Sequence, residues 1–326
     1  MSALLLEVRG LTVEFGPTER PLRVVDDINF DVKAGEALGI VGESGSGKSM
    51  TSLSILRLVP EPPGRVSGEI RFEGTDLMTL PRSRMPDIRG RDIAMIFQEP
   101  MSSLNPVMTI GDQIDEALML HMDLSWAQRR ERTVELLRLV GMPDPKSRLG
   151  AYPSQFSGGM RQRVMIAIAV SCNPKLLIAD EPTTALDVTI QAQVLELMKD
   201  IRTRLNSAVL LISHDLGVIA DLCERVIVMY AGRIVEDADV RSIFKRSRHP
   251  YTRALLQSVP SLAAGQKRLY QIPGSVPQPG TGHRGCPFRP RCALAMEVCE
   301  REMPPLTSYG SGHRAACWAP AEAVAA

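Results

Sequence analysis

A glycine-rich run that ends in a lysine and a serine carries the clearest chemistry in the chain. Residues 42–49 match the phosphate-loop pattern G-x-x-x-x-G-K-[ST] in full. Glycines let the backbone wrap so that its N–H groups face phosphate oxygens, and the helix that follows adds partial positive charge. We expect Lys48 to reach the β- and γ-phosphates of a nucleotide and the Ser49 hydroxyl to bind Mg²⁺. The residues predicted to bind nucleotide here are Gly42, Glu43, Ser44, Gly45, Ser46, Gly47, Lys48, Ser49 and Met50.

Two adjacent carboxylates follow the apolar run Leu176–Ala179. At the end of a strand, Asp180 is suited to hold Mg²⁺ through water. Glu181 is suited to orient and polarise a water that attacks the γ-phosphate. Alone, this pair could simply cap the following turn. Together with the phosphate loop it predicts a nucleotide-hydrolysing site.

A second anion-binding device lies at Ser157, Gly158 and Gly159, where a predicted helix begins. Backbone N–H groups at a helix N-terminus favour an anion, although such a run by itself is also compatible with a flexible loop. One chain needs a single cradle for its own γ-phosphate. We therefore expect this second device to serve the nucleotide of a neighbouring subunit.

The elements that must position these residues are predicted from periodicity. Strands are expected at Leu4–Val8, Leu11–Phe15, Ile28–Val32, Glu36–Val41, Ile93–Phe97, Leu176–Ala179, Ala208–Ser213 and Val226–Tyr230. Helices are expected at Lys48–Leu58, Ile110–Met122, Ala127–Val140, Gly158–Ser171 and Val188–Leu205. The first three strands predict an antiparallel layer. The later alternation of strand and helix predicts an α/β P-loop NTPase fold with a mostly parallel sheet between helices.

The character of the sequence changes from about Gly232, where Pro and Gly become dense and regular periodicity fades. We place a domain boundary near Gly232–Ser247. The predicted organisation is an ATPase domain over residues 1–235, with a helical subdomain at about 100–160. A C-terminal extension over residues 236–326 follows it.

The order of these motifs resembles that of the ABC ATPases over about residues 4–235. The resemblance implies further site residues, each by its matching position. Gln98 corresponds to the Q-loop, which contacts Mg²⁺ or the attacking water. Ser157-Gly158-Gly159 corresponds to the signature motif. The neighbouring residues Phe156 and Met160 depart from the commonest form of that motif. Asp187 corresponds to the D-loop, His214 to the switch histidine and Phe15 to the aromatic residue that stacks on adenine. For Phe15, a half-buried strand residue is a competing interpretation. The resemblance implies two subunits facing head to tail, with each ATP between Lys48 of one and Ser157 of the other.

Several longer stretches resemble the ATPases of dipeptide and oligopeptide permeases. They are residues 100–106, 155–164, 179–193, 249–256 and 285–292. This resemblance implies a five-part bacterial importer of short peptides, or in some relatives of nickel. Its parts are a second ATPase that is more often a paralogue than an identical copy, two transmembrane permease subunits and an extracytoplasmic binding protein.

Four of the six cysteines crowd the C-terminal region, as Cys286, Cys292, Cys299 and Cys317, with the spacing C-x₅-C-x₆-C-x₁₇-C. Four thiolates can hold an iron–sulfur cluster or a structural Zn²⁺. Zinc ribbons use C-x₂-C pairs, which are absent, so the long unequal spacings favour a [4Fe–4S] cluster, as the resemblance also implies. Zn²⁺ and thiols without a metal are the alternatives.

Composition narrows the functional classes. Lys plus Arg total 38 and Asp plus Glu 37, a balance that gives no argument for nucleic-acid binding. We therefore do not expect a soluble ABC ATPase that acts on DNA or the ribosome. The filled positions Glu181 and His214 argue against a catalytically silent partner. No apolar run approaches the roughly 18 residues of a spanning helix, and the N-terminus lacks a signal-peptide pattern. We expect a peripheral protein at the cytoplasmic face of the cell (inner) membrane.

Overall fold

The computed structural model describes residues 3–19, 21–99, 103–184, 186–259, 271–277, 284–319 and 324. Residues 100–102 of the permease-like stretch 100–106 lie outside the described residues. The chain divides into two compact units. Unit 1 comprises Met1–Ala3, Lys33–Glu36 and Leu80–Leu210, and unit 2 comprises Leu4–Val32, Ala37–Thr79 and Leu211–Ala326. The predicted boundary between an ATPase domain, residues 1–235, and a C-terminal extension, residues 236–326, stays a prediction.

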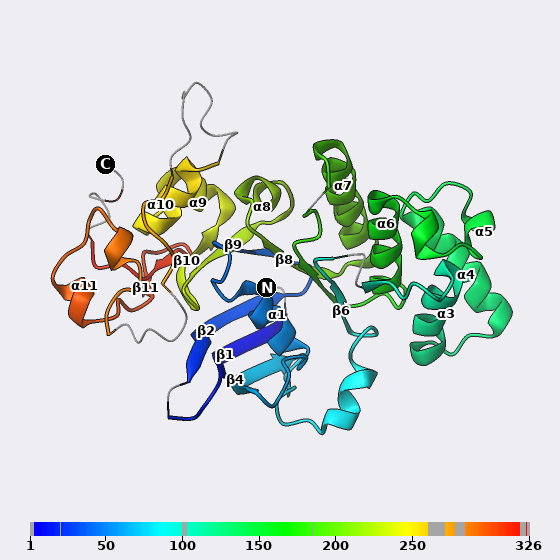
Figure 1. The fold of residues 1–326 in the computed structure, drawn as a ribbon, viewed down its shortest axis with the longest axis horizontal. Helices are drawn as coiled ribbons and strands as arrows, with labels where there is room; N and C mark the ends of the chain where they lie inside the picture. The colour runs from blue at the N-terminus through cyan, green and yellow to red at the C-terminus, as the bar shows by residue number, and fades with distance from the viewer. Residues whose placement is uncertain are drawn as a thin grey trace. The chain divides into compact units, whose positions relative to one another are not determined.

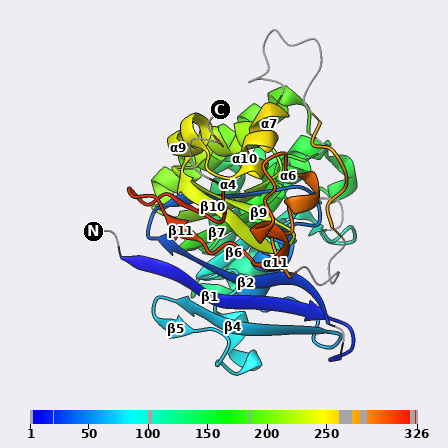
Figure 2. The same ribbon diagram turned by 90° about the vertical axis from the view of Figure 1, so that its left-hand side faces the viewer.

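The first sheet of unit 2 is the expected antiparallel layer. Its strand order is β2 (Leu22–Lys33), β1 (Leu4–Phe15), β4 (Gly64–Phe72) and β5 (Thr75–Asp76), as Figure 2 shows. β1 pairs antiparallel with β4, and the register shifts between Arg9 and Thr12. Gly10 there has a φ of 59°, the left-handed conformation that glycine accepts readily. The two strands predicted at the N-terminus are therefore one strand with an irregularity.

The second set of strands in unit 2 carries the phosphate loop. β3 (Ala37–Val41) pairs parallel with β9 (Arg225–Tyr230), and β10 (Arg233–Asp239) pairs antiparallel with β9. The short strands β12 (Arg314–Ala315) and β11 (Thr307–Ser308) continue the order beyond β10. Every residue of β3 is buried, as expected for an apolar run inside a parallel sheet. The loop leaves β3 and enters α1 (Lys48–Ile55).

Regular structure continues after Gly232 as far as Gln257, although the periodicity of the sequence fades there. β10 is followed by α9 (Val240–Arg246) and α10 (Pro250–Gln257), and α8 (Leu216–Leu222) precedes β9. Glu236 and Asp237 of β10 are both 0% exposed. Periodicity assigns such acids to the surface, but here they are buried because basic partners reach them from elsewhere in unit 2.

Unit 1 contains the predicted helical stretch. β6 (Ile93–Ile96) pairs parallel with β7 (Leu176–Asp180). Figure 1 shows α3, α4, α5 and α6 gathered on one side of this pair, coloured green. The bounds are Ile110–His121 for α3, Trp126–Leu139 for α4, Pro145–Arg148 for α5 and Gly158–Ala169 for α6. α7 (Val188–Leu205) and β8 (Ala208–Ser213) have their predicted bounds, and the other predicted helices here end within two residues of expectation.

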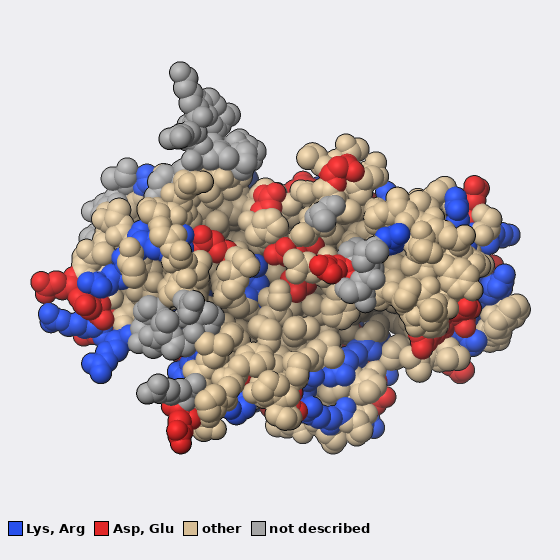
Figure 3. Space-filling view, in the orientation of Figure 1, with Lys and Arg blue, Asp and Glu red and all other residues tan. Residues whose placement is uncertain are grey.

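Short elements complete the chain: the 3₁₀ turns η1 (Arg82–Asp87), η2 (Pro153–Gln155) and η3 (Arg289–Arg291), and the helix α11 (Val298–Arg301). Among the described residues, no helix is both long and apolar enough to cross a membrane. On the face drawn in Figure 3, blue and red side chains are interspersed, in keeping with the balanced composition.

Candidate nucleotide-binding and hydrolysis residues

The phosphate loop has the backbone that its sequence predicts. Gly47, which precedes α1, has a φ of 99°, and a Cβ at this position would lie 2.6 Å from the carbonyl oxygen of Val24. Only glycine fits this combination of conformation and space. Lys48 is buried, and its Nζ donates to the carbonyl oxygens of Gly42 at 2.8 Å and Glu43 at 3.1 Å. The ammonium group is therefore held over the loop.

The loop also contains an unsatisfied polar atom. Ser46 is 1% exposed, and its buried hydroxyl has no hydrogen-bond partner among the described residues. A buried hydroxyl without a partner costs free energy, which an incoming phosphate oxygen would recover. Met50, on the first turn of α1, and Ser49 are half-buried. The donors present in the loop thus fit a polyphosphate.

Two residues to which the sequence analysis gave no role contact this loop. The Glu43 N–H donates to the Tyr251 hydroxyl at 2.8 Å. Arg291 donates from Nη1 and Nη2 to the two carboxylate oxygens of Glu43, at 2.7 and 3.0 Å. Tyr251 lies on α10 and Arg291 ends η3. Nothing in the local sequence signals either contact, because the partners are more than 200 residues away.

The carboxylates in unit 1 follow β7 as predicted. Asp180 ends the strand and is 5% exposed. Glu181 has a φ of 47°, a left-handed conformation that costs a non-glycine residue about 1 kcal/mol or more. Its Oε2 accepts hydrogen bonds from the Gln98 Nε2 at 3.1 Å and from the Thr184 hydroxyl at 2.9 Å. The structure thereby brings together two predicted site residues, Gln98 and Glu181, and adds Thr184.

The signature residues open α6. Ser157 is the N-cap, and its hydroxyl accepts from the Met160 N–H at 3.4 Å. Ser157 and Gly158 are exposed, and a Cβ on Gly159 would lie 2.9 Å from Cγ2 of Ile190. Asp187 caps α7 by accepting from the Ile190 N–H at 2.9 Å. The signature and Asp187 thus meet at the first turn of α7.

A glutamine to which the sequence analysis assigned no role connects α6 with the loop that follows β7. Gln162 is 1% exposed, and its Nε2 donates to the carbonyl oxygen of Pro182 at 2.7 Å. Pro182 follows Glu181 directly. The side chain therefore fixes the start of the loop that holds Glu181 against the signature helix.

Two further predicted residues, Phe15 and His214, lie at or just beyond the ends of strands in unit 2. Phe15 is half-buried at the end of β1, opposite Gly64 of β4. A Cβ on Gly64 would lie 3.1 Å from its ring. His214 is exposed just after β8. Phe15, the phosphate loop and His214 belong to unit 2, whereas Gln98, Asp180, Glu181, Ser157 and Asp187 belong to unit 1.

The four C-terminal cysteines influence one another electrostatically. Burial, and to a lesser degree the other three thiols, raises the pKa of Cys317 to about 11. Burial likewise raises the pKa of Cys286 to about 11, with Cys299 and Cys292 adding to it. The Cys286 N–H also donates to the Cys299 carbonyl oxygen at 2.8 Å. Across the described residues, no group of three or more His, Cys, Asp or Glu side chains is arranged to hold a single metal ion.

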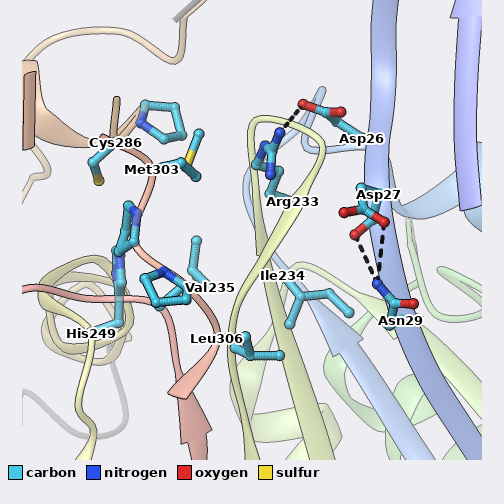
Figure 4. Close-up of a pocket in the computed structure, with 14 residues that line it drawn as sticks. Asp26, Asp27, Asn29, Arg233, Ile234, Val235, His249, Cys286, Met303 and Leu306 are labelled. Carbon is cyan, nitrogen blue, oxygen red and sulfur yellow. Dashed lines mark hydrogen bonds and ion pairs between the residues drawn. The ribbon is translucent and has the colours of Figure 1, made fainter. Parts of the chain in front are cut away.

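Open space adjoins two of these thiols, those of Cys286 and Cys299. A cleft of about 520 Å³ is lined by Cys286 and Cys299 together with Arg284 and Arg301. A separate cavity of about 300 Å³ lies between the β10 hairpin, β2 and the C-terminal segment. Figure 4 shows Cys286 and His249 on one side of it and the Asp26–Arg233 ion pair on the other, with a separation of 2.6 Å between the charged atoms of the pair. The segment therefore has room beside its thiols.

The phosphate loop after β3, the carboxylates after β7 and the Ser-Gly-Gly cap of α6 define an ATPase of the ABC class. Residues 25–184 match the family described as ABC transporter. A solved dimeric ATP-binding cassette, in a post-hydrolysis state with ADP and Pi, is 27% identical with a TM-score of 0.65, covering 73% of this chain and 99% of that one.

Residues 235–299 match a second family, the oligopeptide/dipeptide transporter C-terminal region. The probable peptide ABC transporter ATP-binding protein y4tR of Sinorhizobium fredii is 54% identical, covering 98% of this chain and 96% of its own. The dipeptide transport ATP-binding protein DppD of Haemophilus influenzae is 53% identical, with 94% and 93% covered. The chain belongs to the ATP-binding subunits of the peptide ABC transporters, which are ATPases coupled to transport.

Proposed function

We propose that this chain powers the uptake of dipeptides or oligopeptides through separate membrane subunits. The observation that carries the proposal is the similarity of nearly the whole chain, C-terminal region included, to peptide-transport ATPases. The chain would act as a peripheral subunit at the cytoplasmic face of the cell (inner) membrane. A paralogous ATPase, two permease subunits and an extracytoplasmic binding protein would complete the transporter.

In the proposed reaction, Lys48 and the N–H groups of residues 42–49 bind the β- and γ-phosphates, and Phe15 stacks on adenine. Ser49, Gln98 and Asp180 would hold Mg²⁺, which neutralises charge on the phosphate oxygens. Glu181 orients the attacking water and accepts its proton, and His214 contacts the γ-phosphate. The hydrogen bonds from Gln98 and Thr184 to Glu181 support this role because they fix the direction of the carboxylate.

We propose that ATP is bound between two ATPase subunits facing head to tail. Ser157, Gly158 and Gly159 of one subunit would bind the γ-phosphate of the nucleotide held by Lys48 of the other, with Asp187 at the subunit interface. The exposure of Ser157 and Gly158 at the start of a 12-residue helix supports this assignment. Hydrolysis would then open the pair and move the membrane subunits.

The helical part of unit 1 offers a surface for the membrane subunits. A cavity of about 260 Å³ is lined by Thr109, Gly111, Asp112, Trp126 and other residues of α3, α4 and the loop before α6. Trp126 is 64% exposed, with the Arg130 guanidinium 5.6 Å from its ring centroid. We propose that a cytoplasmic helix of the permease packs here, because an exposed aromatic at the rim of a cleft is typical of binding surfaces.

The loop that leads into this surface is ordered by one buried side chain. Gln113 accepts from the Asn105 N–H at 2.9 Å, and it donates to the carbonyl oxygens of Asn105 at 3.0 Å and Met108 at 3.1 Å. The loop follows the segment that carries Gln98. A partner docked here would therefore contact a loop that Gln113 holds at Asn105 and Met108.

We further propose that Cys286, Cys292, Cys299 and Cys317 hold a [4Fe–4S] cluster. Their mutual effect on pKa and the cleft beside Cys286 and Cys299 support a common site. Four cysteine thiolates are the usual ligand set of a [4Fe–4S] cluster. Because burial raises the pKa values of Cys286, Cys292 and Cys317, cluster assembly must displace protons and is favoured by higher pH.

The test is anaerobic affinity purification of the full chain from its own membranes, with mass spectrometry of partners and iron and zinc analysis of the same sample. We expect two permease subunits, a second ATPase and about four irons per chain. A soluble homodimer without permease subunits would overturn the transport proposal. Zinc in place of iron, or no metal, would overturn the cluster.

Matched variants sharpen both parts of this experiment. Trp126→Glu should lose the permease subunits, whereas Leu22→Glu, which alters an exposed leucine of unit 2, should keep them. Cys286→Ser should lose most of the iron, whereas Cys172→Ser, which alters a buried cysteine of unit 1, should retain it. Equal behaviour of the two members of either pair would contradict the corresponding assignment.

A further inference from the structure

The peptide group between Gly42 and Glu43 is held at both ends. Its carbonyl oxygen, on Gly42, accepts from Lys48 Nζ, and its N–H, on Glu43, donates to the Tyr251 hydroxyl. The two bonds point in opposite directions, as the planar peptide requires. The orientation of the first turn of the phosphate loop is therefore fixed partly by a residue of α10, within the same unit.

Arg291 holds the side chain of the same residue, Glu43, with a fully used guanidinium. Besides the two bonds to the carboxylate, Nε donates to the carbonyl oxygen of Pro273 at 2.8 Å. Nη1 also donates to the Tyr230 hydroxyl at 3.3 Å, and Nη2 to the Ile272 carbonyl oxygen at 3.4 Å. All five N–H directions of the guanidinium are thus occupied, and the Arg291 side chain is 4% exposed.

The position of Arg291 depends on the cysteine segment. Three backbone hydrogen bonds form consecutive turns here. The Arg289 N–H donates to the carbonyl oxygen of Cys286 at 3.1 Å, and the Arg291 N–H donates to that of Phe288 at 2.9 Å. The Cys292 N–H donates to the carbonyl oxygen of Arg289 at 3.2 Å. These turns direct Phe288 onto Tyr230 and Tyr251, with ring centroids 5.2 and 5.4 Å apart. One aromatic cluster therefore sits beneath both contacts to Glu43.

A carboxylate in a loop that binds phosphate disfavours binding, because both groups are negatively charged. A free Glu43 would repel the polyphosphate at short range and could compete for the loop's N–H groups. A buried, bidentate arginine neutralises this charge and holds the carboxylate at both of its oxygens. The contact is therefore suited to support nucleotide binding as well as to attach the C-terminal segment.

We infer that Arg291 is a positioning residue for nucleotide binding: through Glu43, it keeps the phosphate loop in its binding conformation and cancels the loop's negative charge. The inference rests on the proposed role of the loop in binding ATP, and it requires neither peptide transport nor the cluster.

The test is MgATP and ADP binding by the purified full-length chain, measured by calorimetry, together with steady-state ATPase kinetics. Arg291→Met should raise the Kd and KM for MgATP on the order of tenfold and leave kcat within about twofold. Arg291→Lys, which keeps the charge without the fork, should give a smaller loss. Arg289→Met removes an arginine of the same turn whose ion pair with Glu300 is exposed, and should leave the Kd within about twofold.

A second background separates this role from a purely structural one. In a Glu43→Gln chain the negative charge is absent, so adding Arg291→Met should change the Kd by no more than about twofold. The same tenfold loss in both backgrounds would show that Arg291 acts elsewhere. A lower Tm with unchanged Kd and KM would show that it only stabilises the fold. A wild-type chain that fails to bind MgATP would instead sink the proposed role of the loop.

Discussion

Gln98 donates a hydrogen bond from Nε2 to Oε2 of Glu181 at 3.1 Å, across 83 residues of sequence. The same carboxylate oxygen accepts from Thr184, three residues further on. Both hydrogen bonds end on the same oxygen, Oε2 of Glu181. Together they limit the rotation of the carboxylate. The segment that leads toward the proposed docking surface is thus in direct contact with the residue proposed to position water.

Glu181→Gln should keep ATP binding and reduce the rate of hydrolysis by about 10²- to 10⁴-fold, because an amide accepts no proton from the water. The variant should accumulate as a closed dimer with ATP, measurable by size-exclusion chromatography and phosphate release. Glu196→Gln on the exposed face of α7 is the control and should hydrolyse ATP normally. Normal turnover by Glu181→Gln would assign the water to another residue.

Lys48→Ala should weaken MgATP binding by about 10- to 100-fold, the value of one charge-assisted contact. The change also removes the two bonds that hold the Gly42 and Glu43 carbonyl oxygens, so thermal unfolding must be measured alongside calorimetric Kd. Retained affinity in a folded variant would contradict the role of the lysine.

His249 makes stability depend on pH. Burial lowers the pKa of His249 from 6.5 to about 4, although Glu236 raises it. Its Nδ1 accepts from the Tyr251 N–H at 3.1 Å, which only an unprotonated Nδ1 can do. The unfolded chain therefore binds the extra proton first as pH falls below about 6.5, and the free energy of unfolding drops by at most about 1.4 kcal/mol per pH unit down to about pH 4.

His249→Asn should flatten this dependence, because an asparagine can cap α10 without titrating in this range. The measurement is the free energy of unfolding in urea for both chains at about pH 4.5, 5.5 and 7.5. These pH values bracket the interval between the folded and unfolded pKa values of His249, about 4 and 6.5. Parallel pH curves for wild type and variant would rule out His249 as the titrating group.

Local chemistry in the sequence is strong enough to predict much of this molecule. The phosphate loop requires glycine where the backbone is left-handed, as at Gly47, so its pattern implies its conformation. The buried strands β3 and β7 and the starts of the helices at Gly158 and Val188 were also predictable, because each depends on residues close by in the sequence. α1 ends at Ile55, three residues before the predicted Leu58, in a segment where Arg57 takes a left-handed conformation.

What the sequence could not predict depends on partners far along the chain. β10 looks polar because Glu236 and Asp237 lie within it, and their burial makes sense only once His313 and Arg225 are placed beside them. Arg291 and Glu43 are 248 residues apart. No periodicity or motif pairs such residues, since folding alone brings them together.

The pairing of β10 with β12 also has a consequence for synthesis of the chain. His313, the partner of Glu236, is made 77 residues later, as is Arg314, the partner of Asp237. At about 5–20 residues per second, a ribosome needs roughly 4–15 s for that stretch. During this interval β10 has an open edge and acids without these partners, so the nascent chain is exposed to mispairing until β12 emerges.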